Sequence, residues 1–186
     1  MSNNELEILN DSKLKILAIS IDNESKGNIE LVDTKAEAGY LESFQDPEYI
    51  RDLPKIAIPQ LTEGTYRGFE IAGDSMLPLE SGSIIISQYV ESITALKNDK
   101  TYIIVSKSEG LVYKRVRNDK DNQRLILISD NPLYLPYTLD YSEIQEIWQF
   151  HASITFSDSP ASYHQSIDAK LSEIKNKLDG LEEKIS

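Results

Sequence analysis

The sequence predicts a mostly-β domain, because short apolar segments alternate with clusters of turn-forming residues through the middle of the chain. The length of 186 residues suits one well-buried domain with appendages and hardly two full domains. With 27% charged and 40% hydrophobic residues, the composition is typical of a folded soluble protein. We therefore expect one compact, mostly-β domain with extensions.

The order of the expected strands follows from the apolar segments. Polar turn residues separate them, as in Glu109-Gly110 and over 118–122. The small and polar stretch over 33–40 predicts a flexible loop. Strands are expected at 14–21, 29–32, 66–72, 83–90, 101–107, 111–117, 124–129 and 144–151.

The C-terminal tail has a different pattern. Residues 157–166 resemble a linker, and the apolar positions that follow are spaced alternately by four and three residues. This heptad spacing predicts a coiled-coil helix for self-association, or an amphipathic helix that folds back on its own domain. The expected division is an N-terminal arm at 1–28, the main domain at 29–156, and a linker with an oligomerisation helix at 157–186. The heptad positions are Ile167, Leu171, Ile174, Leu178, Leu181 and Ile185.

Charge and composition exclude several functions. The net charge of −12 opposes non-specific binding to phosphate backbones, so no direct DNA contact is expected. Without cysteine there is no disulfide framework, thiolate zinc site or cysteine nucleophile. The two histidines, His151 and His164, are too few for a three-histidine metal site within one chain. We expect neither a metal nor a cofactor.

Targeting and membrane segments are not expected either. The first ten residues are acidic and polar, unlike a signal peptide. The densest apolar runs, at 16–19 and 84–86, are far shorter than the ~18 residues that span a bilayer. A cytoplasmic protein without membrane contact is expected.

A serine follows the apolar strand expected at 66–72. In the sequence Gly73-Asp74-Ser75, the strand ends in a turn that would present the Ser75 hydroxyl to a cleft. The same residues also suit the N-terminal cap of a helix starting at Met76. Taken alone, this segment favours the cap.

A lysine lies between two β-branched residues of a later strand. Strand alternation places Lys114 on the same face as Val112 and Val116, toward the core. Burial there would lower the pKa of its amine and make it a usable base near neutral pH. The alternative is an edge-strand lysine whose amine reaches solvent, and this segment taken alone favours that alternative.

Together, the two segments resemble the LexA-like family of self-cleaving serine peptidases, which includes LexA, phage repressors and UmuD-type proteins and shares its fold with signal peptidases. The resemblance covers roughly 29–156. It depends on three stretches: Gly73-Asp74-Ser75-Met76-Leu77-Pro78, Val112-Tyr113-Lys114-Arg115-Val116, and Ser129-Asp130-Asn131-Pro132 with 134–137.

The resemblance implies a serine endopeptidase with Ser75 as nucleophile and Lys114 as general base. It also implies self-cleavage between Ala38 and Gly39 and stimulation by a RecA filament in a stress or prophage response. The chain is further expected to associate with itself as a homodimer or higher oligomer. An Ala/Gly loop that is never cut is the alternative. Two departures from the family pattern are Gly82-Ser83, where Gly-Asp is usual, and Glu37, where many relatives have a small apolar residue.

The LexA and phage-repressor relatives carry a helix-turn-helix domain before the peptidase, and none can be placed in the first 37 residues. The chain is therefore expected to be the C-terminal half of a transcriptional regulator. Alternatively, it is a short-arm protein like UmuD that serves a translesion polymerase, or a dormant dimerisation module. Signal peptidase is rejected because no membrane anchor is found. The most basic stretch is interpreted as a solvated hairpin: Lys114, Arg115, Arg117, Lys120 and Arg124.

Overall fold

The computed structural model describes residues 28–61, 63–156 and 175. The chain divides into two units, Met1–Thr155 and Phe156–Ser186, and the candidate site belongs to the first. The prediction of a mostly-β fold is confirmed, since a single nine-stranded sheet and two short α-helices account for the regular structure within 28–156, apart from two 3-10 turns. The strand expected at 14–21 lies outside the described residues, as does the heptad helix except for Lys175, which is helical.

The sheet is mixed, with the order β2-β1-β3-β4-β9-β5-β6-β7-β8. Only β1 and β3 pair in parallel, and the other neighbours are antiparallel. Every strand expected within the described residues is present, with ends that differ by at most three residues. The strands are β1 (Asn28–Val32), β2 (Lys55–Ala57), β3 (Tyr66–Glu70), β4 (Ile84–Tyr89), β5 (Lys100–Ser106), β6 (Gly110–Asp119), β7 (Arg124–Ile128), β8 (Tyr137–Asp140) and β9 (Ile144–Ile154); the 3-10 turns are η1 (Ile93–Ala95) and η2 (Tyr141–Glu143).

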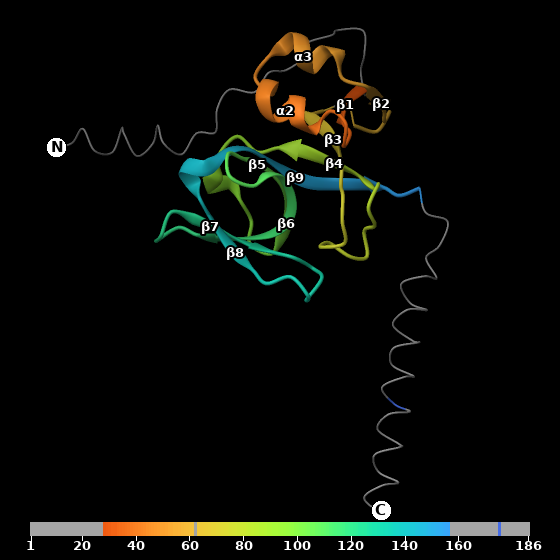
Figure 1. Cartoon of the computed structure of the whole chain (residues 1–186). Coiled ribbons are helices and arrows are strands. Elements are labelled where there is room, and N and C mark those ends of the chain that lie inside the picture. The colour runs from red at the N-terminus through yellow and green to blue at the C-terminus, as the bar shows by residue number, and fades with distance from the viewer. Residues whose placement is uncertain (1–27, 62, 157–174, 176–186) are drawn as a thin grey trace, which may run out of the picture. The chain divides into compact units, whose positions relative to one another are not determined.

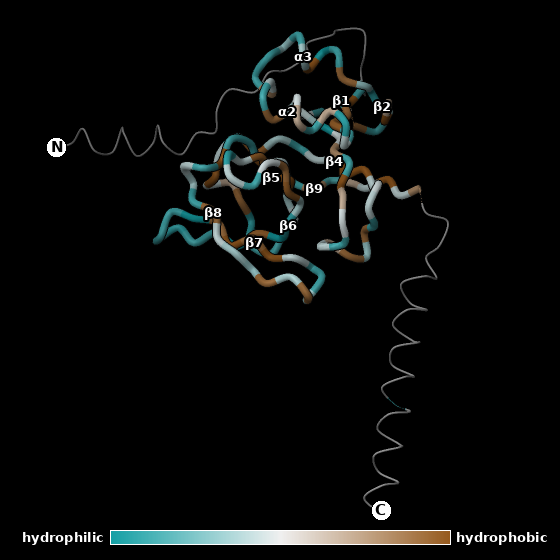
Figure 2. The backbone as a smooth tube through the Cα atoms, viewed as in Figure 1, coloured by the Kyte–Doolittle hydropathy of each residue, from teal (hydrophilic) through white to brown (hydrophobic). Residues whose placement is uncertain are grey.

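The central strands are buried on both faces. In β5, Tyr102 and Ile104 belong to one core cluster, whereas Ile103 and Val105 belong to another. Because successive side chains of a strand point to opposite faces, each face of β5 covers its own core. This explains the unbroken apolar character of the strand, and Figure 2 shows hydrophobic colour along the central strands and hydrophilic colour at the β6–β7 turn.

The prediction of a flexible loop at 33–40 is wrong for residues 37–40, because the helix α2 (Glu37–Ser43) begins there. Tyr40 and Phe44 are four residues apart, so both side chains lie on one face of the helical segment, and both are buried in the core beneath it. The amide of Ala36 donates to the Asp33 carboxylate at 2.8 Å just before the first turn. Tertiary burial therefore orders a segment whose small residues suggested a loop.

A second helix, α3 (Pro47–Asp52), follows directly. Asp46 caps it by accepting a hydrogen bond from the Glu48 amide at 2.9 Å, and Pro47 occupies the first helical position, where no amide donor is needed. Figure 1 shows α2 and α3 beside β1, β2 and β3, with the β7–β8 hairpin at the opposite end of the domain.

Candidate active site

Ser75 lies in the loop that joins β3 to β4. The loop is closed at its base, where the Ile71 amide donates to the Ser83 carbonyl at 2.9 Å and the Gly82 amide donates to the Ile71 carbonyl at 2.8 Å. Residues 72–83 contain no helical residue. The helix-cap interpretation is therefore wrong, and the half-buried Ser75 is presented by a turn.

Lys114 points from β6 into the same region. Its side chain is buried, with 8% of the residue exposed, which confirms the inward-facing prediction and makes the edge-strand alternative wrong. The Lys114 Nζ lies 2.7 Å from the Ser75 Oγ and 3.0 Å from the Ser129 Oγ. The structure thus brings together the two residues that the sequence singled out, although 38 residues lie between them in the chain.

Burial lowers the pKa of the Lys114 amine. The face of the Tyr134 ring, 5.9 Å from Nζ, offers the charged form some compensation, but desolvation is the cause that determines the direction. A larger fraction of the amine is therefore neutral near physiological pH than for a lysine in water. A neutral amine at this distance from the Ser75 Oγ is able to act as a proton acceptor.

The third matched stretch braces the serine loop. The Asn131 amide donates to the Ser75 carbonyl at 3.0 Å, and the Asn131 side-chain Nδ2 donates to the Asp74 carbonyl at 3.0 Å. The Tyr134 hydroxyl donates to the Asp74 carboxylate. The sequence assigns no role to Ser129 or Asn131 within the matched stretch. In the structure, Ser129 contacts the Lys114 amine and Asn131 contacts the loop that carries Ser75.

A cavity of about 190 Å³ opens beside the Ser75–Lys114 pair. One of its walls includes Glu37, the first residue of α2, so the segment that holds the expected cleavage site borders the same cavity as Ser75. A polypeptide that entered the cavity would meet the Ser75 hydroxyl. The lining residues are Glu37, Glu70, Ile71, Ala72, Gly73, Ser75, Met76, Leu111, Val112, Tyr113 and Lys114.

Ala38 and Gly39 do not line this cavity. Both lie within α2, where Ala38 is exposed and Gly39 is half-buried against the Tyr49 side chain. A peptide bond inside a helix has its carbonyl engaged in the helical ladder and is not extended across a nucleophile. The structure therefore places the expected cleavage site close to the pair but in a folded conformation.

The basic stretch lies in the β6–β7 hairpin, as predicted, but the prediction of a solvated hairpin is wrong for Lys114, which is buried. The arginines of the hairpin pair with carboxylates. Arg115 makes two hydrogen bonds of 2.7 Å to Asp130. Arg117 pairs with Asp99 at 2.7 Å, and Arg124 pairs with Asp119 at 2.9 Å. His151 is exposed and its ring lies against Tyr66, whereas His164 lies outside the described residues.

Comparison with protein-family models and with curated proteins gives no match to the chain. Within the part of the chain that the structure describes, no helix is both long and apolar enough to cross a membrane. What the site can do is therefore inferred from its geometry.

Proposed function

We propose that this chain is a Ser/Lys peptidase of the LexA-like kind, that it cleaves itself between Ala38 and Gly39, and that it is the regulatory half of a transcriptional regulator. The observation that carries the proposal is the 2.7 Å approach of the buried Lys114 Nζ to the Ser75 Oγ beside an open cavity. A serine next to a group able to take its proton is the minimal arrangement for covalent acyl transfer.

The proposed reaction has two stages. Neutral Lys114 removes the Ser75 hydroxyl proton while Oγ attacks the Ala38 carbonyl carbon, and Lys114 then returns this proton to the Gly39 nitrogen as the peptide bond breaks. The product is an ester between the Ala38 carbonyl and Ser75. Water, deprotonated by Lys114, hydrolyses that ester and restores the serine. Each stage transfers one proton through the lysine, and no metal or cofactor is needed.

The helix across the expected cleavage site makes unwinding a required step. Ala38 must leave α2 and become extended before its carbonyl carbon can reach Ser75 at the roughly 3 Å separation that attack requires. We therefore propose slow cleavage in the isolated protein and faster cleavage when a partner favours the extended form. By the family resemblance, that partner is a RecA filament, and the cleaved protein is a cytoplasmic homodimer assembled partly through 167–185.

The proposal predicts two defined fragments. Purified protein, incubated from about pH 7 to about pH 10 with and without activated RecA, is expected to yield masses that correspond to a cut between Ala38 and Gly39. Ser75→Ala should abolish the cut. Ser81→Ala, which changes an exposed serine of the same loop, should leave it intact.

Intact mass spectrometry measures both fragments directly. Uncut protein under all of these conditions would reject the peptidase and favour the dormant dimerisation module. That alternative has one observation in its favour, namely the folding of Ala38 and Gly39 into a helix. A UmuD-like protein would also be cut, and would differ by binding a translesion polymerase afterwards.

Ser129 is expected to orient the base. Its hydroxyl lies 3.0 Å from the Lys114 Nζ and is buried, so Ser129→Ala removes one of the two contacts that hold the amine in place. We expect a roughly tenfold slower cleavage with little change in stability, because one neutral hydrogen bond contributes about 1 kcal/mol. Ser129→Thr, which keeps the hydroxyl, should recover most of the rate in the same mass assay; equal rates for all three proteins would contradict the role.

A further inference from the structure

A buried polar cluster lies beneath α2 and involves the residue that follows the expected cleavage site. Tyr40 donates its hydroxyl hydrogen to the Glu146 carboxylate and accepts a 2.7 Å hydrogen bond from the Arg67 Nη1. The Trp148 indole donates to the same Glu146 oxygen at 3.0 Å. All four residues are at most 1% exposed. We call Tyr40, Arg67, Glu146 and Trp148 the latch cluster.

The members of the latch cluster come from different parts of the fold. Arg67 belongs to β3, and Glu146 and Trp148 belong to β9, so three members are fixed in the sheet. The Arg67 guanidinium carbon lies 4.7 Å from the Trp148 ring centre and 5.4 Å from that of Tyr40, which restricts it further. Tyr40 is the member that belongs to α2. Its hydroxyl therefore joins the helix to two charged groups of the sheet.

The other side of the expected cleavage site is also held. The Thr34 amide donates to the Glu70 carboxylate at 3.0 Å, and the Tyr49 hydroxyl donates to the Ala36 carbonyl at 3.0 Å. Gly39 packs so closely on Tyr49 that an added Cβ would lie 2.8 Å from the tyrosine oxygen. The bond between Ala38 and Gly39 is thus fixed on both sides, and the latch cluster is the more deeply buried attachment.

We propose that Tyr40 is a positioning residue that keeps the Ala38–Gly39 bond folded in α2, and that cleavage requires its withdrawal from the latch cluster. The statement that cleavage requires this withdrawal rests on the proposed function, whereas the statement that Tyr40 keeps α2 folded does not. A buried charge pair is rarely the most stable filling for a core, and apolar residues of similar volume do as well or better. Arg67 and Glu146 instead form directional hydrogen bonds that fix the position of the Tyr40 hydroxyl.

The energetic logic gives the direction of the effect. In Tyr40→Phe the ring still fits, but the closed state loses both hydrogen bonds between the hydroxyl and the buried charges. When α2 opens, water reaches these charges and replaces the lost bonds, so the variant shifts the equilibrium toward the open form. We expect the open population of residues 37–43 to rise about tenfold or more.

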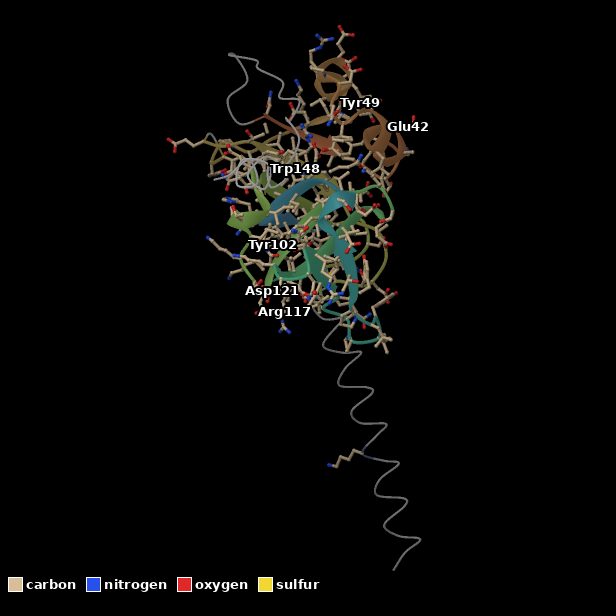
Figure 3. The ribbon with its side chains drawn as sticks, turned by 90° about the vertical axis from the view of Figure 1, so that its left-hand side faces the viewer. Glu42, Tyr49, Tyr102, Arg117, Asp121 and Trp148 are labelled. Atoms are coloured by element: carbon tan, nitrogen blue, oxygen red, sulfur yellow. The ribbon has the colours of Figure 1, made fainter. Side chains whose placement is uncertain are left out.

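The test measures opening without cleavage. In a Ser75→Ala background, amide hydrogen exchange of residues 37–43 should be about tenfold faster or more with Tyr40→Phe, whereas exchange in β5 should stay the same. The matched control is Tyr102→Phe, because Tyr102 is equally buried and its hydroxyl bonds to the Lys97 backbone. Figure 3 shows Tyr102 well away from Glu42 of α2, with Trp148 between them.

Two readouts separate this inference from the proposed function. With Ser75 intact, Tyr40→Phe should speed cleavage about tenfold at the same bond, and Tyr102→Phe should not. Faster exchange at 37–43 in a protein that never cuts itself would support the latch and reject the peptidase. Exchange no faster than in the Tyr102→Phe control, or slower cleavage in Tyr40→Phe, would overturn the latch.

Discussion

Lys114→Met is expected to lower the rate of self-cleavage by roughly 10²- to 10⁴-fold, the range that a positioned general base contributes. Methionine keeps an unbranched apolar stem in the buried site and removes the amine that lies 2.7 Å from the Ser75 Oγ. The fold should survive, because the buried end of the side chain changes from polar to apolar. Intact mass measured against time, at one pH and one protein concentration, gives the rate.

The pH profile makes the test more specific to the base. Because burial lowers the pKa of Lys114, the wild-type rate should rise with pH and be half-maximal below about pH 10.4, the ordinary pKa of lysine. The control is Lys107→Met, which removes an exposed lysine just after the end of β5 and should retain both rate and profile. A Lys114→Met protein that cleaves at the wild-type rate would exclude Lys114 as the base.

Ser75 and Lys114 could each be singled out from a local pattern, although each segment taken alone favoured a non-catalytic interpretation. A strand that ends in Gly73-Asp74 presents the next residue in a turn, and strand alternation alone places Lys114 on the face of Val116. Their meeting required the resemblance, since alternation does not say which strands are neighbours. The role of Asn131 needed coordinates, because its contacts join the β7–β8 connection to a loop more than fifty residues earlier.

The helices and the latch cluster were missed for different reasons. The Tyr40 and Phe44 spacing that predicts α2 was present, but the small residues before it favoured a loop, and burial against the sheet decided the outcome. Asp46-Pro47 is a recognisable helix start that was not used. Arg67 and Glu146 carry no local signal, since charged residues in strands are ordinarily exposed and only the sheet order brings both beneath α2.

In the β7–β8 connection, the loop that contacts the Ser75 segment leaves two leucines in solvent. Leu133 and Leu135 are 85% and 84% exposed, while Tyr134 between them turns back to Asp74. The loop is held by the Asn131 side chain, which accepts from the Leu133 amide at 3.1 Å. Figure 2 shows the apolar colour at the tip of this connection. The hydrogen bonds of Asn131 and Tyr134 therefore fix the loop in a conformation that exposes both leucines.

Arg67→Met is expected to cost about 3–5 kcal/mol in the free energy of unfolding, the largest effect on stability that we predict. Burial raises the pKa of Glu146 and the Arg67 guanidinium opposes that rise, so its removal leaves the buried carboxylate without a compensating charge. Urea denaturation followed by the fluorescence of Trp148, which lies in the same cluster, measures the loss. Arg117→Met breaks an exposed ion pair with Asp99 and should cost at most about 1 kcal/mol.

The pH dependence identifies the cause of that loss. Burial raises the pKa of Glu146 despite Arg67, so the folded protein binds a proton more readily than the unfolded chain, and this residue's contribution to stability falls as pH rises above about 4.3, the ordinary value. Without Arg67 the pKa rises further, so the carboxylate is protonated over a wider range. The deficit of Arg67→Met should therefore be large near pH 7 and shrink toward pH 4, where Glu146 is neutral in both proteins. A deficit that stays constant with pH would show that Arg67 stabilises the domain through packing against Trp148 instead of through its charge.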